Sequence, residues 1–261
     1  MSTGNSLVVT EINGGILRVE IRRPDKKNAL TGPMYALLAD AFEAAERDPG
    51  VRVVLIHGQP EMFTAGNDLA DFLEHPPIKD DPPPPVFRFL EAFRTLTKPF
   101  VAAVSGVAVG VGTTMLLHCD LVYAGESARF QLPFVNLGLC PEAASSLLLP
   151  ALAGHARAAE ILLLGEAFDA AKAVEIGIVN AVLPDASVLD HAMAQARKLA
   201  AQPAASVRLT KQLMKRAQAT LVEQTMREEG RHFRARLISP ESKEAFTAFI
   251  EKRKADFSRF N

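Results

Sequence analysis

The stretch from Lys98 to Asp120 constrains the fold of this chain more than any other. After Pro99 comes the short apolar run Phe100 to Val104, which predicts a buried strand. Three glycines then lead into a helical pattern: Gly106, Gly110 and Gly112. Glycine lets main-chain N–H groups approach a ligand closely, and a helix N-terminus adds partial positive charge. We therefore expect a site for an anion or an oxyanion at this strand-to-helix turn.

The composition indicates one globular protein. Of the 261 residues, 48% are hydrophobic and 23% are charged, which suits a single large core and is too mixed for disorder. The net charge of −1 gives no global field for nucleic acid or an anionic membrane, so neither is expected as a partner. No run approaches the roughly 20 apolar residues of a membrane helix. Because Cys119 and Cys140 lack CxxC spacing, we expect reduced thiols in a soluble, cytoplasmic protein.

The N-terminal part predicts a hairpin and a helix. Residues 7–12 and 16–21 read as two strands that turn at Asn13-Gly14-Gly15. Thr31 is expected to cap an amphipathic helix that runs to about Arg47.

A second strand and a second glycine-marked turn follow. Val51 to His57 predicts a buried strand, and Phe63 to Leu69 contains the turn. Residues 75–85 hold six prolines and predict an extended loop, because proline runs favour polyproline II. This loop is either a lid over a ligand or an ordinary surface loop. Residues 88–96 then predict a helix.

The remaining pattern defines the fold class. Short strands are predicted at 121–124, 128–130 and 178–182, with helices between them, one of them capped by Asp169. Residues 203–261 are charged, helical in pattern and nearly free of strand signals. Strand, turn and helix thus recur before a helical tail. This favours an α/β fold of repeated ββα-like units over a doubly wound Rossmann sheet.

Several common cofactor motifs are absent. The spacing of Gly106, Gly110 and Gly112 is not that of a dinucleotide fingerprint, and the sequence has neither a phosphate-binding P-loop nor a G-x-S-x-G elbow. None of the six histidines is paired at metal-ligand spacing. We therefore expect no metal and no redox cofactor.

Four segments in chain order carry a more specific signal. They are Arg23-Pro-x-x-x-Asn28-Ala29-Leu30, Phe63-x-Ala65-Gly66-x-Asp68, Lys98-Pro-x-x-Ala-Ala-Val-x-Gly106-x-Ala-x-Gly110-x-Gly112, and Phe249-Ile-Glu-Lys252-Arg-Lys. Through them the whole chain resembles the crotonase (enoyl-CoA hydratase/isomerase) superfamily. The resemblance implies a spiral α/β core over residues 1–200, and a helical region over 201–261 for oligomerisation and for closing the CoA site. It also implies a trimer or hexamer, and an acyl-CoA thioester as substrate with no further cofactor.

The resemblance also implies an oxyanion hole made of two main-chain amides, one from each glycine-marked turn. On this sequence these are the amides of Ala65 and Val111. Removing a proton next to a thioester places negative charge on the carbonyl oxygen, and two fixed donors stabilise that charge. The residues implied to bind the substrate are Lys26, Ala65, Gly66, Asn67, Asp68, Leu69, Val111, Phe249 and Lys252.

The acid/base residues differ from the hydratase pattern. Hydratases of this superfamily carry two glutamates, and the corresponding positions here are Thr114 and Phe134, which cannot act as a base. The segment Leu137 to Ser146 instead resembles the Pro-Glu-Gly-x-Ser-Ser stretch of peroxisomal-type Δ3,Δ2-enoyl-CoA isomerases, whose glutamate is the single base. Here that residue is Glu142. Burial would raise its pKa, and a helix N-terminus would oppose the rise. The alternative is a first-turn glutamate that only complements a helix dipole.

Three functions remain open at this point. The first is an isomerase that uses Glu142 as its only acid/base. The second is a hydratase-like enzyme of fatty-acid degradation, and the third is a non-catalytic acyl-CoA-binding relative. A carboxylate at position 142 argues against the third, because a binding protein has no need of it. Acyl chain length, branching and pathway are not encoded in these motifs.

Overall fold

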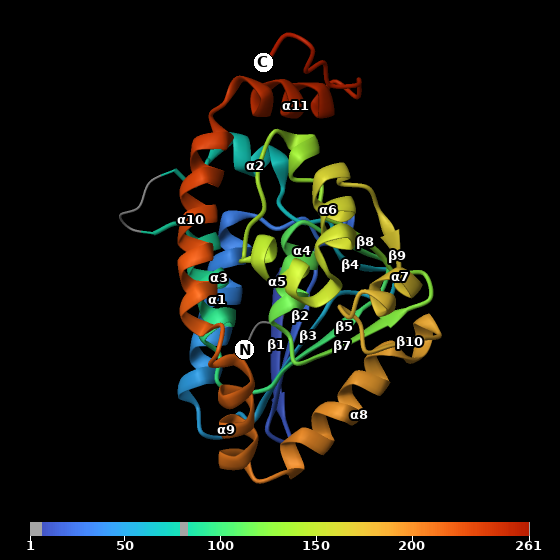
Figure 1. The fold of residues 1–261 in the computed structure, drawn as a ribbon. Coiled ribbons are helices and arrows are strands. Elements are labelled where there is room, and N and C mark those ends of the chain that lie inside the picture. Colours follow the sequence, from blue (N-terminus) through green and yellow to red (C-terminus); the bar gives the residue numbers. More distant parts are fainter. Residues whose placement is uncertain (1–6, 79–82, 261) are drawn as a thin grey trace.

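The computed structural model describes residues 7–78 and 83–260, and its centre is a twisted six-stranded sheet (Figure 1). The strand order is β1-β2-β3-β5-β7-β10. β1 and β2 are antiparallel and the later neighbours are parallel. The strands are β1 (Val8–Asn13), β2 (Ile16–Ile21), β3 (Val53–His57), β5 (Phe100–Val104), β7 (Leu121–Gly125) and β10 (Ala181–Leu183).

The predicted N-terminal hairpin is confirmed. Asn13 pairs with Ile16, and Gly14 and Gly15 between them both have positive φ, the conformation that a two-residue hairpin turn requires. The strand predicted over 178–182 is shifted along the chain, because pairing with β7 begins only at Ala181.

A second, smaller sheet has the order β4-β6-β8-β9. Its strands are β4 (Met62–Thr64), β6 (Val107–Val109), β8 (Arg129–Gln131) and β9 (Phe168–Asp169). Strands that follow each other along the chain alternate between the two sheets. β3, β5 and β7 belong to the large sheet, and β4, β6 and β8 belong to the small one. This confirms the predicted repetition of ββα units. Because β4 and β6 are parallel neighbours, the turns that follow them lie at the same edge.

Helices cover both faces of the large sheet. On one face lie α1 (Gly32–Arg47) and α3 (Pro85–Thr95), whose Phe42 and Phe89 rings meet edge to face at 5.4 Å. On the other face lies α8 (Val188–Ala201), which packs its alanines against Val53, Leu55 and Val101. Thr31 precedes α1 as predicted, although its side chain makes no capping hydrogen bond.

Short helices follow the strands of the small sheet. α2 (Leu69–Glu74) begins after β4, and α4 (Val111–Thr114) begins after β6 and continues into a 3-10 turn at Met115–His118. Further 3-10 turns occupy Pro24–Lys26, Val135–Leu137 and Asp185–Ser187. The glycine-marked turn of the central stretch therefore leads into a helix N-terminus, as expected.

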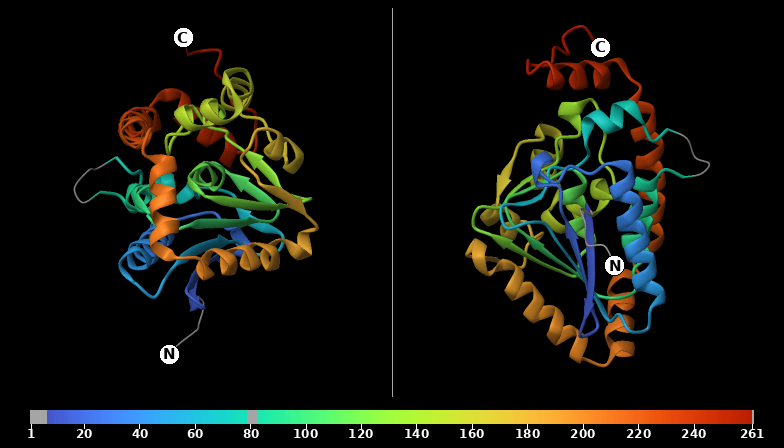
Figure 2. Two further views of the ribbon diagram at one scale, coloured as in Figure 1. Left: turned by 60° about the horizontal axis from the view of Figure 1, so that its bottom comes forward. Right: turned by 180° about the vertical axis from the view of Figure 1, so that it is seen from behind.

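The second half of the chain is mainly helical. Its further helices are α5 (Ser145–Ala153), α6 (His155–Leu164), α7 (Ala170–Glu175), α9 (Ala204–Lys215), α10 (Ala219–Leu237) and α11 (Pro240–Ile250). Asp169 caps α7 through a 2.8 Å hydrogen bond from the amide of Lys172, as predicted. Within the described residues no strand follows α8. α10 lies beside α3, with α9 beyond one of its ends and α11 beyond the other (Figures 1 and 2).

Two expectations need correction or restriction. Glu142 lies in the loop before α5, which begins at Ser145, and not in the first turn of a helix. Residues 79–82 of the proline-rich loop lie outside the described residues. The two alternatives for residues 75–85, a lid or an ordinary surface loop, therefore both stay predictions. Among the described helices none is both long and apolar enough to span a bilayer.

Candidate active site

The turn after β4 is held by buried polar side chains from the loop after β2. Asn28 is fully buried, and its Oδ1 accepts a 2.6 Å hydrogen bond from the amide of Arg23. Its Nδ2 donates to the carbonyls of Met62 and Phe63 at 3.1 and 3.0 Å. The Arg23 guanidinium also forms a 2.6 Å ion pair with Asp68, which caps α2. These motif residues therefore position the turn.

The two glycine-marked turns are in close contact at Gly66 and at Gly112. A Cβ atom on Gly66 would lie 2.6 Å from the carbonyl oxygen of Val109, and one on Gly112 would lie 2.6 Å from Cγ2 of Thr64. Gly66 also has a φ of +82°. Glycine at both positions is thus required for the close approach.

The main-chain amides of the two turns differ in availability. The Ala65 amide donates to the carbonyl of Lys27 at 3.0 Å, so it is already engaged. In the part of the chain that the structure describes, no main-chain hydrogen bond is donated by the amides of Asn67 or Val111. Val111 is the first residue of α4, where an N–H has no partner within the helix. The predicted oxyanion role of Ala65 therefore conflicts with its hydrogen bond, whereas that of Val111 is compatible with the geometry.

Glu142 is a buried carboxyl group. It is 6% exposed, and among the described residues its Oε1 has no hydrogen-bond partner. Burial raises the pKa of Glu142 to about 8, with a smaller contribution from the negative charge of Glu229. A carboxyl group with such a pKa can both accept and release a proton near neutral pH.

The alternative role of Glu142 as a helix-dipole residue is wrong, because another glutamate fills it. Glu229 on α10 accepts hydrogen bonds from the amides of Ala144 and Ser146 at 2.6 and 3.0 Å, at the N-terminus of α5. Glu229 was not identified from the sequence, where it is one of several charged residues in a helical run. Phe233 lies one helical turn further along α10, and its apolar side chain was the available sign in the sequence that the Glu229 face of this helix is buried.

Glu142 and Ala143 line a pocket between α3 and α10. The pocket measures about 320 Å³. Its apolar wall consists of Phe87, Leu90, Met226 and Phe233, and its rim carries Glu91, Glu223, Arg227 and Arg234. The apolar wall suits the acyl chain of a ligand, and Glu142 is the proton-transfer group beside it.

Tyr35 connects this carboxyl to the first turn. The buried Tyr35 hydroxyl donates a hydrogen bond to Oδ1 of Asn67. Burial raises the pKa of Tyr35 well above its usual value, and the nearby charge of Glu142 adds to the effect. The phenol is therefore a neutral donor beside both groups, and sequence patterns gave no sign of it beyond its place on the buried face of α1.

The two positions that carry glutamates in hydratases hold no acid here. Thr114 is buried in α4, and its hydroxyl lies 3.5 Å from the carbonyl of Val111. Phe134 is buried and packs against Phe233. Neither residue can accept a proton from a substrate.

Of the remaining predicted binding residues, Leu69 is half-buried against the core, and Lys26, Phe249 and Lys252 are exposed. Lys26 ends an exposed 3-10 turn, and Leu69 begins α2. Phe249 at the end of α11 is 62% exposed, and Lys252 follows it. Among the described residues, no hydrogen bond or ion pair joins Lys252 to Lys26 or to the turn at 65–69. Closure of the C-terminal segment over a nucleotide therefore stays a prediction.

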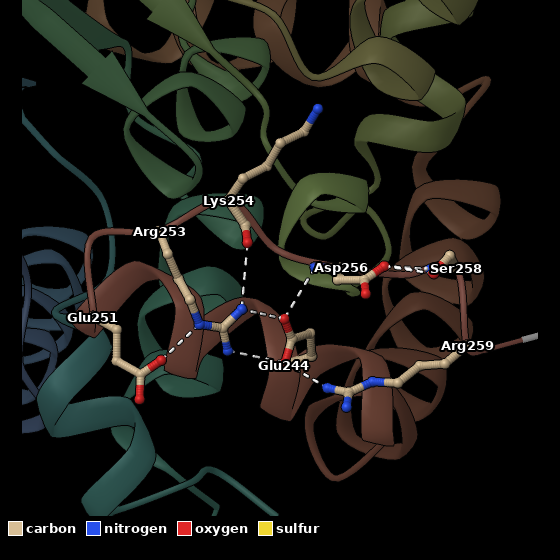
Figure 3. Close-up of polar contacts among 7 residues, drawn as sticks. All are labelled: Glu244, Glu251, Arg253, Lys254, Asp256, Ser258 and Arg259. Atoms are coloured by element: carbon tan, nitrogen blue, oxygen red, sulfur yellow. Dashed lines mark hydrogen bonds and ion pairs between the residues drawn. The ribbon is translucent and has the colours of Figure 1, made fainter.

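The tail after α11 is held by one carboxylate (Figure 3). Glu244 accepts hydrogen bonds from Arg253 at 2.5 Å, from Arg259 at 2.8 Å and from the amide of Asp256 at 3.0 Å. These contacts fold the tail back onto α11.

The fold and this site define a family. A profile of the enoyl-CoA hydratase/isomerase family matches residues 11–259, and the chain belongs to this family. The predicted crotonase-like fold is confirmed by the structure of Pseudomonas aeruginosa OdaA, which superimposes with a TM-score of 0.91 at 48% identity and covers 94% of this chain and 99% of that one.

Curated relatives include isomerases and hydratases. The chain is 33% identical to 1,2-epoxyphenylacetyl-CoA isomerase of Escherichia coli K12, over 96% of this chain and 98% of that protein. It is 32% identical to 2,3-dehydroadipyl-CoA hydratase of the same organism, over 93% and 94%. It is 34% identical to enoyl-CoA delta isomerase 2 of Rattus norvegicus, and the matched region covers 95% of this chain and 63% of that protein. At such identities the chain is an enzyme of this superfamily, and the individual reaction is a separate question.

Proposed function

We propose that the protein is a Δ3,Δ2-enoyl-CoA isomerase in which Glu142 is the single acid/base. The observation that carries the proposal is a buried carboxyl oxygen without a partner among the described residues, in a pocket with one apolar wall, with no acid at positions 114 and 134. One proton-transfer group suffices for moving a double bond, whereas the two-glutamate route to hydration needs a second.

The reaction proceeds in two proton transfers. The Glu142 carboxylate takes a proton from C2 of a 3-enoyl-CoA, and the electron pair moves into a dienolate whose charge collects on the thioester oxygen. The same carboxyl group then returns the proton at C4, which leaves the double bond between C2 and C3. No metal or redox cofactor takes part in these steps.

The dienolate oxygen is bound by the amides of Asn67 and Val111. Both lack an acceptor among the described main-chain hydrogen bonds, and both follow glycines in turns that touch each other. Asn67 replaces Ala65 in this role because the Ala65 amide is occupied by Lys27. Loss of one such donor costs about 3 kcal/mol of barrier.

The CoA moiety is proposed to lie along Lys26 and the turn at 65–69, with Phe249 and Lys252 near its nucleotide end. A homotrimer or hexamer is proposed as well, since apolar side chains on α9 such as Leu209 and Leu213 are more than half exposed. Light scattering at micromolar concentration tests this, and a monomer mass would contradict it. We place the protein in the cytoplasm.

The decisive experiment compares wild type with Glu142→Gln on separate 3-enoyl-CoA and 2-enoyl-CoA substrates. Gln keeps the size of the side chain but cannot accept the C2 proton, so isomerisation should fall about 100- to 10,000-fold. Acyl-CoA affinity should stay within a few-fold. Thr114→Ser and Phe134→Leu serve as controls at the hydratase positions and should have much smaller effects.

The same assay separates the alternatives. Formation of a 3-hydroxyacyl-CoA from 2-enoyl-CoA as the main activity would identify a hydratase. Binding without turnover of either substrate would identify a non-catalytic relative. Deuterium at C2 should appear in part at C4 of the product if one carboxyl group carries it. Isomerisation at the wild-type rate by Glu142→Gln would refute the mechanism.

A further inference from the structure

The peptide unit between Ala143 and Ala144, one residue beyond Glu142, is held on both sides by buried side chains. The carbonyl of Ala143 accepts a 2.7 Å hydrogen bond from Nε2 of His118, and the amide of Ala144 donates to Glu229 at 2.6 Å. A carbonyl only accepts, so His118 carries its proton on Nε2. Burial lowers the pKa of His118 to about 4 and keeps this imidazole neutral.

This peptide unit is in an unfavourable conformation. Ala143 and Ala144 have φ values of 56° and 57°, in the left-handed region, although neither is glycine. That region costs an L-residue roughly 1–2 kcal/mol. The hydrogen bonds to His118 and Glu229 offset this cost, and backbone strain of this kind is typical of functional sites.

Glu229 also fixes the start of α5. Its second oxygen accepts hydrogen bonds from the amide and the hydroxyl of Ser146, at 3.0 and 2.5 Å. Ala144, the residue that precedes α5, has no side-chain oxygen for capping, so a carboxylate from α10 takes that role. Burial raises the pKa of Glu229, while these hydrogen bonds act in the opposite direction and favour its charged form.

We propose that Glu229 is a positioning residue for Glu142, because it anchors the strained turn that presents Glu142 to the pocket. The inference rests on the proposed role of Glu142 in proton transfer. Glu229 itself does not line the pocket of Glu142.

Other titratable groups face the same region from several elements. They are Tyr35 on α1, Glu91 on α3, His118 before β7, Cys140 in the loop of Glu142, Glu223, Arg227 and Arg234 on α10, and, on the other side of Glu229, Glu228 and His232. Glu91 and Glu223 are ion-paired with Arg94 and Arg227. Arg234 stacks on Phe87 at 5.2 Å. Burial is the main cause of the raised pKa of Glu142, and Glu229 is the group whose negative charge adds to it.

The test is Glu229→Gln, with Glu228→Gln as its matched control. The control removes the same charge from the adjacent residue of α10, whose side chain is 61% exposed and paired with Arg231. Titration of the Glu142 carboxyl by infrared or ¹³C spectroscopy, assigned with Glu142→Gln, reports its basicity without turnover. For Glu229→Gln we expect a lower titration midpoint, the acid limb of kcat/KM displaced by the same amount, and kcat reduced about tenfold or more with little change in KM. Glu228→Gln should match wild type.

Two further comparisons keep the outcome decisive. If Glu229→Gln does not fold, the double variant with Ala144→Gly is compared with Ala144→Gly alone, because glycine removes the left-handed penalty. A midpoint unchanged by loss of Glu229 would overturn the inference and reduce Glu229 to a helix cap. If Glu229→Gln shifts the titration midpoint of Glu142 but the wild-type protein has no isomerase activity, the link between Glu229 and Glu142 is supported. The proposed reaction, and not the link, is then overturned.

Discussion

Gly66 lies so close to Val109 that a single methyl group would not fit between them. A Cβ on Gly66 would be 2.6 Å from the Val109 carbonyl oxygen. This contact joins the turn after β4 to the end of β6 and brings the amides of Asn67 and Val111 to the same edge of the small sheet.

Gly66→Ala should therefore disrupt the site as well as the turn. The substitution adds a steric overlap with main chain to the left-handed penalty of roughly 1–2 kcal/mol. Gly14→Ala is the matched control, because Gly14 also has positive φ but a methyl group there would meet no atom within 4 Å. Thermal unfolding should show a larger loss for Gly66→Ala, and its isomerase activity should fall while that of Gly14→Ala is retained. Equal losses would mean that the contact is unimportant.

Val111→Pro should remove one oxyanion donor with little damage to the helix. Proline is well tolerated at the first position of a helix, where Val111 lies, and it has no N–H. We expect kcat to fall by about 100- to 1,000-fold, the effect of losing one such donor. Val111→Ala keeps the amide and should stay near wild type. Similar rates for the proline and alanine variants would exclude this amide from the mechanism.

Glu142→Gln should stabilise the protein at alkaline pH even as it inactivates it. The pKa of Glu142 is about 8 in the folded protein against 4.5 ordinarily, so the folded state holds an extra proton between these values. Wild-type stability is therefore lost as pH rises through this window, and the Gln variant escapes that loss. By pH 8 its Tm should exceed that of wild type by at least 2–4 °C, about the shift that 1 kcal/mol produces. A constant difference from pH 5 to pH 8 would contradict the assignment.

His118 should make the protein sensitive to acid. Its pKa is about 4 in the folded state against 6.5 ordinarily, so the unfolded state takes up a proton first as pH falls. Stability is thus lost between pH 6.5 and pH 4. His118→Gln retains an N–H donor for the Ala143 carbonyl but does not titrate in this range. Its Tm should decline less steeply than that of wild type across the same interval, and parallel slopes would show that other groups dominate.

Lys252→Ala tests the proposed nucleotide end of the CoA site. Loss of one exposed charge near phosphates should weaken binding of CoA esters by up to about fivefold, in line with surface ion pairs worth at most about 1 kcal/mol. A pantetheine analogue without the adenosine phosphates should bind unchanged. Lys254→Ala, also exposed, is the control on the same tail. Equal losses for both ligands would remove Lys252 from the phosphate site.

Much of the architecture follows from local sequence. The hairpin at Gly14-Gly15, the alternation of strand and helix and the helix starting near Gly112 were all predicted, because side-chain periodicity and glycine act over a few neighbouring residues. The family motifs, together with the absence of an acid at positions 114 and 134, were enough to select the candidate base.

The sequence by itself thus determined the fold class, the glycine-marked turns and the identity of the candidate acid/base. Only the tertiary structure showed that the Ala65 amide is occupied by Lys27 and that the Asn67 amide donates no main-chain hydrogen bond among the described residues. It alone placed Glu229, which is 85 positions from Ala144, at the start of α5. The physical reason is that periodicity specifies which face of an element is buried, whereas the partner of each buried polar group is set by long-range packing that brings distant segments together.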